Sequence, residues 1–328
     1  PMRGSQRAAA GALLLALLPT ALEWLLAREF AVHTSGGVLI TGASTGIGHH
    51  AAVALARQGY HVYAGVRKEA DAAAISGAGI ATLHPVTIDV ADSASLAAAV
   101  ASVGDALEAL GLPLIAVVNN AGISKDLPVE VQSLSSARQV FDVNYFGAVD
   151  VTQQFLPLLR AAGGGARIVT TGSLAGWISM PGTATYSGTK HALEAFSDAL
   201  RMELQPHDIS VSLIKPGYVV TEIGAKALAG SDPEALARSN PAGHALYKDF
   251  LELEAIRVKH VFELAPGPEV TTEVITHAIT SRHPKTRYFV GAAGVLPGWV
   301  AARIKWLLPD RLWDLMIAYE EIITRSLA

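Results

Sequence analysis

Cysteine is absent from this chain of 328 residues, and its absence removes several kinds of chemistry. Disulfide bonds, thiolate nucleophiles and cysteine-ligated metals all require that side chain. Eleven histidines remain, but none has the spacing of a His-Glu-x-x-His metal site. We therefore expect no metal centre, and we interpret the histidines as surface or partly buried structural residues.

Charge is also scarce in the sequence. Lys, Arg, Asp and Glu make up 16% of the residues, the formal net charge is -4, and 51% of the residues are apolar. No basic run with interleaved aromatic residues occurs, which argues against nucleic-acid binding. The length suits one large α/β domain or two smaller ones.

The first 35 residues differ in character from the rest. An apolar stretch at 8–27 follows two arginines and is interrupted by Pro19 and Glu23. Its leucines gather on one side at 100° per residue, which predicts a one-sided hydrophobic helix. Its uncharged part, 8–22, is shorter than the roughly 20 residues of a bilayer span. A signal anchor, a cleaved targeting peptide, an interfacial helix and a helix docked on protein all remain open. We favour membrane association, at the endoplasmic reticulum or another organelle, over a cytoplasmic location.

From residue 36 onward, short apolar runs alternate with helical patterns. The runs are continuously apolar, as in strands that are buried on both faces of a sheet. They lie at 38–40, 60–66, 86–90, 114–118 and 167–171, with helices predicted at 47–58 and 93–110 and a long helical region interrupted near Asn144. We predict an α/β fold with a Rossmann-type, doubly wound parallel sheet and helices on both faces. We assign 36–291 to this domain, 222–264 within it to a substrate-covering segment, and 292–328 to a C-terminal helical extension.

A glycine-rich turn follows the first predicted strand and opens the first helix. Glycine lets a backbone approach a pyrophosphate closely, and a helix N-terminus offers free N–H groups and the positive end of its dipole. The turn therefore predicts a dinucleotide site, the alternative being a plain strand-to-helix turn. It spans Thr41 to Gly48 and includes Gly42, Ser44, Thr45, Gly46 and Ile47.

The end of the second predicted strand indicates the type of dinucleotide. An acidic residue there would bind the adenosine ribose hydroxyls and favour NAD(H), but none occurs before Glu69. The guanidinium of Arg67 suits a 2′-phosphate. We therefore favour NADP(H) over NAD(H). The alternative for Arg67 and Lys68 is a solvated basic pair in a loop.

Tyr186 and Lys190 are four residues apart in a predicted helix, so their side chains share one face. An ammonium stabilises a phenolate, and we expect Lys190 to lower the pKa of Tyr186 from about 10 toward the neutral range. The pair alone is a weak signal. Together with Ser173 at the end of a strand and the glycine-rich turn, it predicts hydride transfer between a nicotinamide and an alcohol or carbonyl carbon.

These motifs, in this order, resemble the short-chain dehydrogenase/reductase family over residues 38–291. The matching motifs are Thr41 to Gly48, Asp89-Val90, Asn119 to Gly122, Asn144, Ser173, Tyr186 to Lys190, and Pro216-Gly217 with Thr221. The resemblance implies that Tyr186 is the general acid/base, that Lys190 lowers its pKa and binds the nicotinamide ribose, and that Ser173 binds the substrate oxygen. It also implies that Asn144 holds a water in a proton relay to Lys190.

The resemblance implies the cofactor contacts as well. Asp89 and Val90 would lie beside the adenine, Asn120 by the adenosine ribose, and Val219 and Thr221 at the carboxamide. Gly122, Pro216 and Gly217 complete the expected cofactor-binding set. One departure is Thr45, which stands where enzymes with strong NADP preference often carry a basic residue.

Two segments, 63–67 and 192–200, are similar to the branch that holds retinol dehydrogenases and 17β-hydroxysteroid dehydrogenases. Apolar residues beside Ser173 and in the C-terminal tail suit a bulky lipophilic substrate. These residues include Leu174, Trp177, Ile178, Met180, Trp313 and Met316. We expect an oxidoreductase for a retinoid, steroid or long-chain alcohol or ketone, forming a homodimer or homotetramer. The alternatives are a non-catalytic nucleotide-binding subunit and a soluble reductase of small carbonyl compounds.

The C-terminal run from Gly294 to Ile323 carries three tryptophans, spaced seven residues apart from Trp299 to Trp313, with basic residues between them. Pro309 interrupts this run, so we predict that it does not form one continuous helix. The run could lie at a membrane interface, close the substrate cleft or form a subunit contact, and the sequence leaves these three readings open.

Overall fold

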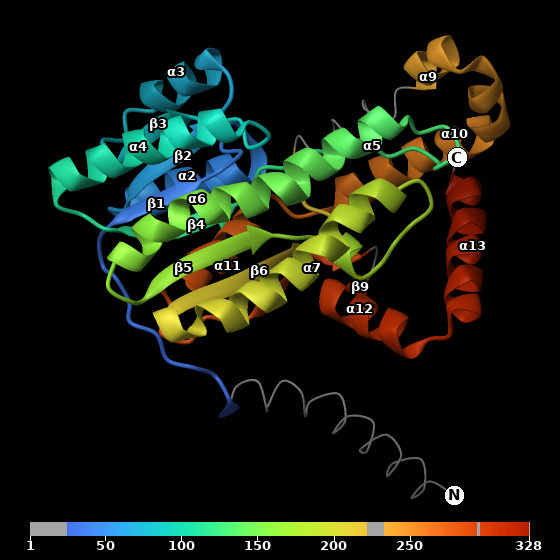
Figure 1. Ribbon diagram of the computed structural model, residues 1–328. Coiled ribbons are helices and arrows are strands. Elements are labelled where there is room, and N and C mark those ends of the chain that lie inside the picture. The colour runs from blue at the N-terminus through green and yellow to red at the C-terminus, as the bar shows by residue number, and fades with distance from the viewer. Residues whose placement is uncertain (1–24, 222–232, 294–295, 328) are drawn as a thin grey trace, which may run out of the picture.

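The computed structural model describes residues 25–221, 233–293 and 296–327. Most of the predicted N-terminal hydrophobic helix lies outside these residues. Seven strands form one sheet in the order β3-β2-β1-β4-β5-β6-β7, and every neighbouring pair is parallel (Figure 1). The strands are β1 (Gly37–Ile40), β2 (His61–Val66), β3 (Leu83–Thr87), β4 (Leu114–Asn119), β5 (Ala166–Thr171), β6 (Ile209–Pro216) and β7 (Arg287–Val290).

Helices cover both faces of this sheet, and each face has its own apolar core. On one face lie α2 (Gly46–Arg57), α3 (Glu69–Gly77) and α11 (Glu269–Thr280). On the other lie α4 (Ser93–Leu110), α6 (Gly147–Ala161) and α7 (Ala184–Leu204), with α5 (Leu134–Phe141) packed against α7. The predicted doubly wound α/β fold is confirmed. Its strand order reverses between β1 and β4, which is where sheets of this kind bind ligands at their carboxyl edge.

The third strand differs from its prediction. It runs from Leu83 to Thr87, whereas the sequence pattern placed it at 86–90. The strand includes Pro85, which an edge strand such as β3 tolerates because it has a neighbour on one side only. After Thr87 the N–H of Ile88 still donates to Val66 O at 2.8 Å, and Asp89 and Val90 follow at the carboxyl edge, where they line the cavity.

The predicted interruption near Asn144 is a π-helical turn, Asp142–Phe146, between α5 and α6. Such turns place one extra residue in a helical ring and are frequent at functional sites. Asn144 is buried at this turn. The long helical region is therefore confirmed, with its break at the predicted place.

The segment before β1 is fixed to the amino edge of the sheet. The backbone N–H of Phe30 donates to Arg282 O at 2.8 Å, and the buried guanidinium of Arg167 donates to Ala31 O at 2.8 Å and Ser281 O at 3.0 Å. The same guanidinium lies 5.3 Å from the centre of the Phe30 ring. These contacts hold the chain from about residue 28 onward against the domain.

The remaining helices stand beyond β6 and β7 and enclose the carboxyl edge (Figure 1). From residue 233 onward the chain forms α9 (Pro233–Ser239) and α10 (Pro241–Leu264), and α10 contacts α13. The C-terminal extension is helical, as predicted, and Pro309 separates α12 (Gly298–Leu307) from α13 (Asp310–Leu327). Short elements complete the chain: η2 (Leu174–Gly176), η3 (Gln205–His207), β8 (Ala292–Ala293) and β9 (Leu296–Pro297).

Among the described residues, α4 is long and apolar enough to cross a membrane by length and composition alone. Its leucines and valine at 96, 103 and 107 pack on the sheet and belong to the core. We therefore interpret α4 as a core helix of the domain.

Candidate active site

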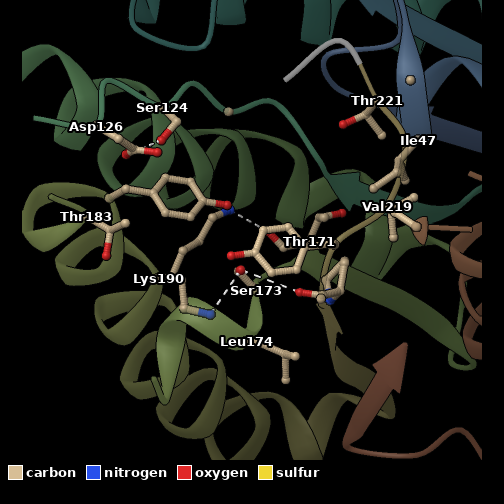
Figure 2. A pocket seen from close by; sticks show the side chains of 18 of the residues that line it. Ile47, Ser124, Asp126, Thr171, Ser173, Leu174, Thr183, Lys190, Val219 and Thr221 are labelled. Atoms are coloured by element: carbon tan, nitrogen blue, oxygen red, sulfur yellow. Dashed lines mark hydrogen bonds between the residues drawn. The ribbon is translucent and has the colours of Figure 1, made fainter. Parts of the chain in front are cut away.

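A cavity of about 830 Å³ opens at the carboxyl ends of the strands. It brings together most residues that the sequence predicted as functional, and Figure 2 shows part of its lining. The predicted residues that line it are Gly42, Ser44, Thr45, Gly46, Ile47, Arg67, Asp89, Val90, Asn120, Gly122, Ser173, Tyr186, Lys190, Pro216, Gly217, Val219 and Thr221. Gly48 and Asn144 are not part of this lining, and both lie in the layer behind it.

The glycine-rich turn has the close packing that a phosphate cradle requires. A Cβ on Gly42, whose φ is +66°, would lie 2.7 Å from the Cα of Ala121. A Cβ on Gly48 would lie 2.4 Å from the amide nitrogen of Asn120. That amide donates to the carbonyl oxygens of Thr41 and Gly42 and holds the turn in place. No side chain caps the start of α2, so its first N–H groups face the cavity without a competing acceptor. The turn therefore fits a dinucleotide pyrophosphate.

Asn144 connects the π-helical turn to two neighbouring segments. Its Oδ1 accepts from the N–H of Ile123 at 2.8 Å, and its Nδ2 donates to Ile123 O at 2.9 Å and to Thr189 Oγ1 at 3.1 Å. Thr189 precedes Lys190 on α7. Asn144 thus fixes the loop after β4 against the helix that carries the Tyr–Lys pair.

Tyr186 and Lys190 face the cavity from α7, and Ser173 faces it from the turn after β5. The Lys190 Nζ donates to Thr171 O at 2.8 Å and lies 5.5 Å from the centre of the Tyr186 ring. Burial lowers the pKa of Lys190 to about 8. The three side chains therefore meet at one point of the cavity, as predicted.

The expected fall in the pKa of Tyr186 is wrong. The pKa of Tyr186 is raised to about 12, chiefly because the phenol is desolvated; the hydrogen bond with Ser173 lowers this pKa and the charge of Asp126 raises it. The reason is that the phenol is desolvated and the ammonium of Lys190 is directed at a carbonyl oxygen instead of the phenol oxygen. At neutral pH Tyr186 is a protonated, partly buried phenol, which can donate a hydrogen bond or a proton.

A scan against protein-family models matches residues 37–232 to the short chain dehydrogenases. The chain belongs to the short-chain dehydrogenase family. It is therefore an oxidoreductase of the dehydrogenase/reductase type that acts on CH–OH and C=O groups. The family expected from the sequence motifs is confirmed.

Several curated proteins are similar over most of their length. The uncharacterized oxidoreductase YbbO of Escherichia coli is 36% identical over 277 residues, which cover 84% of this chain and 92% of YbbO. Retinol dehydrogenase 5 of Mus musculus is 32% identical, with 94% and 96% covered. An NADPH-dependent 3-dehydrocapnine reductase of Ornithobacterium rhinotracheale is 32% identical, with 87% and 96% covered.

Solved structures share the fold. A short-chain dehydrogenase of Burkholderia cenocepacia in complex with NADP superposes with a TM-score of 0.63 at 24% identity and covers 86% of this chain and 97% of its own. One from Burkholderia phymatum in complex with NAD has a TM-score of 0.67 at 23% identity, with 88% and 97% covered. At identities below 25%, these similarities establish the fold alone.

Sequence reasoning missed a polar group on the substrate side of the short-chain dehydrogenase cavity. Asp126, in the loop after β4, and Glu254 and Arg257, on α10, all line the cavity. Asp126 and Ser124 lie together in Figure 2, and the Ser124 hydroxyl donates to Asp126 Oδ1 at 2.6 Å. No local pattern marks these residues, because they come from a loop and a helix whose meeting depends on the tertiary fold.

The apolar lining is confirmed in part. Leu174, Ile178, Met180, Trp313 and Met316 line the cavity, as do many residues in the second half of α10. Trp177 does not, because its ring covers a buried lysine on β6 instead. The segment 222–232 lies outside the described residues.

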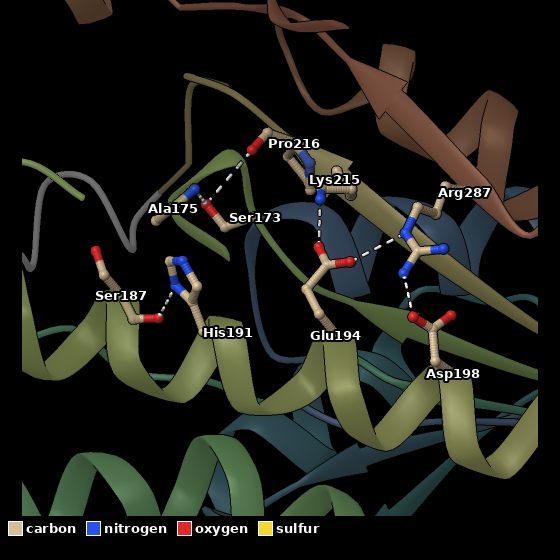
Figure 3. Close-up of polar contacts among 9 residues, drawn as sticks. All are labelled: Ser173, Ala175, Ser187, His191, Glu194, Asp198, Lys215, Pro216 and Arg287. Atoms are coloured by element: carbon tan, nitrogen blue, oxygen red, sulfur yellow. Dashed lines mark hydrogen bonds and ion pairs between the residues drawn. The ribbon is translucent and has the colours of Figure 1, made fainter. Parts of the chain in front are cut away.

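The buried lysine is Lys215, and it belongs to a network that fixes α7 to the sheet (Figure 3). Its Nζ lies 3.8 Å from the centre of the Trp177 ring and forms an ion pair with Glu194. Arg287 of β7 donates to Glu194 at 3.0 Å and to Asp198 at 2.6 Å. Glu194 and Asp198 continue the four-residue spacing of the Tyr–Lys pair along α7, so the network sets the position of the catalytic face.

We expect Glu194→Gln to destabilise the protein by about 3–5 kcal/mol, because it leaves the buried ammonium of Lys215 without its carboxylate. Urea unfolding measures the change. The matched control is Lys248→Met, which breaks an exposed pair with Glu252 at 3.8 Å and should cost less than about 1 kcal/mol. Equal effects of the two variants would show that the buried network does not stabilise the fold.

Proposed function

We propose that this short-chain dehydrogenase transfers hydride between NADP(H) and a lipophilic alcohol or ketone of the retinoid, steroid or long-chain type. The observation that carries the proposal is that Tyr186, Ser173 and Lys190 line one cavity whose two halves differ in chemical character. One half is the glycine-rich turn at the start of α2. The other half is largely apolar and comes from α10, α12 and α13.

The proposed mechanism assigns a step to each side chain. A bound nicotinamide cofactor supplies or accepts the hydride. In reduction, Tyr186 gives its proton to the carbonyl oxygen, and the hydroxyl of Ser173 donates a hydrogen bond to the same oxygen as negative charge develops there. Lys190 places a positive charge 5.5 Å from the centre of the Tyr186 ring, and this charge attracts the phenolate that the step creates. Oxidation of an alcohol reverses these steps.

Two relatives support the substrate class. A retinol dehydrogenase and a 3-dehydrocapnine reductase each align with this chain over 96% of their own lengths. The apolar lining agrees with a large lipophilic substrate. A non-catalytic subunit would have no chemical need for a desolvated Tyr186 beside Lys190, and a reductase of small carbonyl compounds would leave much of the cavity unfilled.

The adenosine end of the cavity supports NADP(H). Arg67 and Lys68 line it and are exposed, and Arg67 makes no hydrogen bond or ion pair within the described residues. Asp71, at the start of α3, lines the same end. The guanidinium of Arg67 would attract a 2′-phosphate, whereas the carboxylate of Asp71 would repel it. We propose that the attraction by Arg67 outweighs the repulsion by Asp71.

The C-terminal helices support contact with a membrane surface. Trp306 is 81% exposed and Leu307 70% exposed on α12, and Leu315 and Tyr319 are each 65% exposed on α13. Basic residues lie close by, with the guanidinium of Arg303 5.5 Å from the centre of the Trp299 ring. Exposed tryptophan with neighbouring arginine and lysine suits a lipid interface, so we propose that this surface rests on the membrane.

Tyr186→Phe should lower turnover by roughly 10²- to 10⁴-fold, because the variant lacks the proton that reduction requires. We would measure turnover of retinoid, steroid and long-chain substrates by nicotinamide absorbance, and cofactor binding by fluorescence, which the variant should retain. Tyr247→Phe is the matched control, since Tyr247 bonds Glu130 at the surface outside the cavity. Full activity of the Tyr186 variant would refute the proposed mechanism.

Two substitutions should move cofactor preference in opposite directions. Arg67→Ala should lower the preference for NADP(H) over NAD(H) by roughly 10- to 100-fold, because a charge-assisted contact is lost. Asp71→Asn should raise that preference, because it removes a negative charge beside the phosphate. Steady-state kinetics with both cofactors gives the ratios, with Arg57→Ala at the exposed end of α2 as the control. An unchanged ratio in Arg67→Ala would exclude its proposed role.

Membrane contact should depend on the exposed residues of α12. Replacing Trp306 and Leu307 by serine should weaken binding to phospholipid vesicles by at least roughly tenfold, because both side chains would leave the interface. Vesicle co-sedimentation measures this binding. Leu110→Ser, at the exposed end of α4, serves as the control. Equal binding by the double variant and the control would place the membrane contact elsewhere.

A further inference from the structure

Asp126 is the unexplained charge of the substrate half. It lies in the loop after β4 and lines the cavity together with Tyr186, close enough for its charge to act on the phenol. The Ser124 hydroxyl donates to its Oδ1 at 2.6 Å, which fixes the carboxyl group in place. Within the described residues, no cation lies at ion-pair distance from Asp126. Hydride transfer by Tyr186, Ser173 and Lys190 does not require this carboxylate.

The neighbouring cation, Arg257, already binds two other residues. Arg257 donates through Nε to Glu254 at 2.9 Å, through Nη2 to the same carboxylate, and through Nη1 to the hydroxyl of Tyr218 at 2.8 Å. One arginine therefore stands against two carboxylates, Glu254 and Asp126. The substrate half keeps one uncompensated negative charge when Asp126 is ionised.

The other cations that line the cavity lie elsewhere. Arg67 and Lys68 belong to the adenosine end, and Lys190 donates to Thr171 O. His260 of α10 also lines the cavity, and its Nδ1 lies 4.0 Å from the carboxylate of Glu263. Lys190 is the cation beside Tyr186, and among the described residues no cation forms an ion pair with Asp126. The carboxylate of Asp126 is available to bind a cationic group of the substrate. Charge favours a cation at Asp126, since an unpaired and partly buried carboxylate gains most from an opposite partner.

We propose that Asp126 binds an ammonium group that the substrate carries close to the reacting carbon. The substrate class is then lipophilic amino alcohols and the corresponding amino ketones, with the apolar body of the molecule in the part of the cavity that Phe262, Trp313 and Met316 line. The inference rests on the proposed function, since it names the substrate class of the same site.

The ionisation of Asp126 agrees with this role. The pKa of Asp126 is raised to about 6, chiefly by burial and also by the charge of Glu254, while the hydrogen bond from Ser124 and the charge of Arg257 lower it. Tyr186 faces it from α7 as a neutral phenol. Asp126 is therefore largely ionised at pH 7 and neutral at pH 5, and an ammonium bound at pH 7 stabilises the ionised form.

The test compares three stable long-chain probes with NADP⁺: 2-aminohexadecan-3-ol, hexadecan-3-ol and hexadecane-2,3-diol. We expect the wild-type kcat/KM to be highest for the amino alcohol. Asp126→Asn should reduce the ratio of kcat/KM for the amino alcohol over hexadecan-3-ol by roughly 10- to 100-fold. Asp105→Asn, the same change at an exposed position of α4, should keep the wild-type ratio.

A pH series adds a readout that altered packing alone would not produce. The wild-type KM for the amino alcohol, relative to that for hexadecan-3-ol, should rise as pH falls from 7 to 5, because Asp126 gains a proton. In Asp126→Asn this relative KM should stay flat. Cofactor binding by the variant, followed by fluorescence, shows that it is folded.

Each contrary outcome has a distinct meaning. Equal preference for the diol and the amino alcohol would overturn the ammonium proposal, because Asp126 would then recognise a neutral donor. Preference for hexadecan-3-ol would overturn it and leave the proposed function intact. Turnover of none of the three probes, nor of any retinoid or steroid alcohol, would contradict the proposed function and this inference with it.

Discussion

The desolvation of Tyr186 and Lys190 side by side on α7 is the constraint on which the other features of the site depend. Desolvation keeps the phenol protonated and brings the pKa of the ammonium to about 8. Both effects need α7 to stay in one rotation against the sheet. The next two residues of the same helical face, Glu194 and Asp198, fix that rotation through ion pairs with β6 and β7. One face of α7 therefore carries both the proposed catalytic residues and the ion pairs that hold the helix in position.

The cavity joins two halves built in different ways. The cofactor half consists of strand ends, the glycine-rich turn and the start of α2, all of which follow from the parallel sheet. The substrate half comes from the loop after β4 and from α10, α12 and α13, which lie outside the sheet. The first half can bind the same ligand in many enzymes of this fold, while the second determines which molecule reaches Tyr186.

The sequence predicts the first half much better than the second. Local spacing identifies the glycine-rich turn and the Tyr–Lys pair, and continuous apolar runs locate the strands. The boundary of the third strand was wrong by three residues, and whether a strand can include Pro85 depends on the edge position of β3, which local pattern does not give. The direction of the pKa shift of Tyr186 depends on burial, which no local pattern gives. Asp126 and Arg257 approach each other only in the folded chain. They are too far apart in the sequence for helical or strand periodicity to relate them.

The central claim is that the desolvated phenol serves hydride transfer to a lipophilic carbonyl carbon. The most direct measurement uses NADPH that carries deuterium on the transferring face of C4, incubated with the enzyme and a long-chain ketone, with the product analysed by mass spectrometry and NMR. The account predicts one deuterium on the carbinol carbon and none elsewhere. A product without deuterium on that carbon, or NADPH bound without any alcohol formed across the substrate panel, would contradict it.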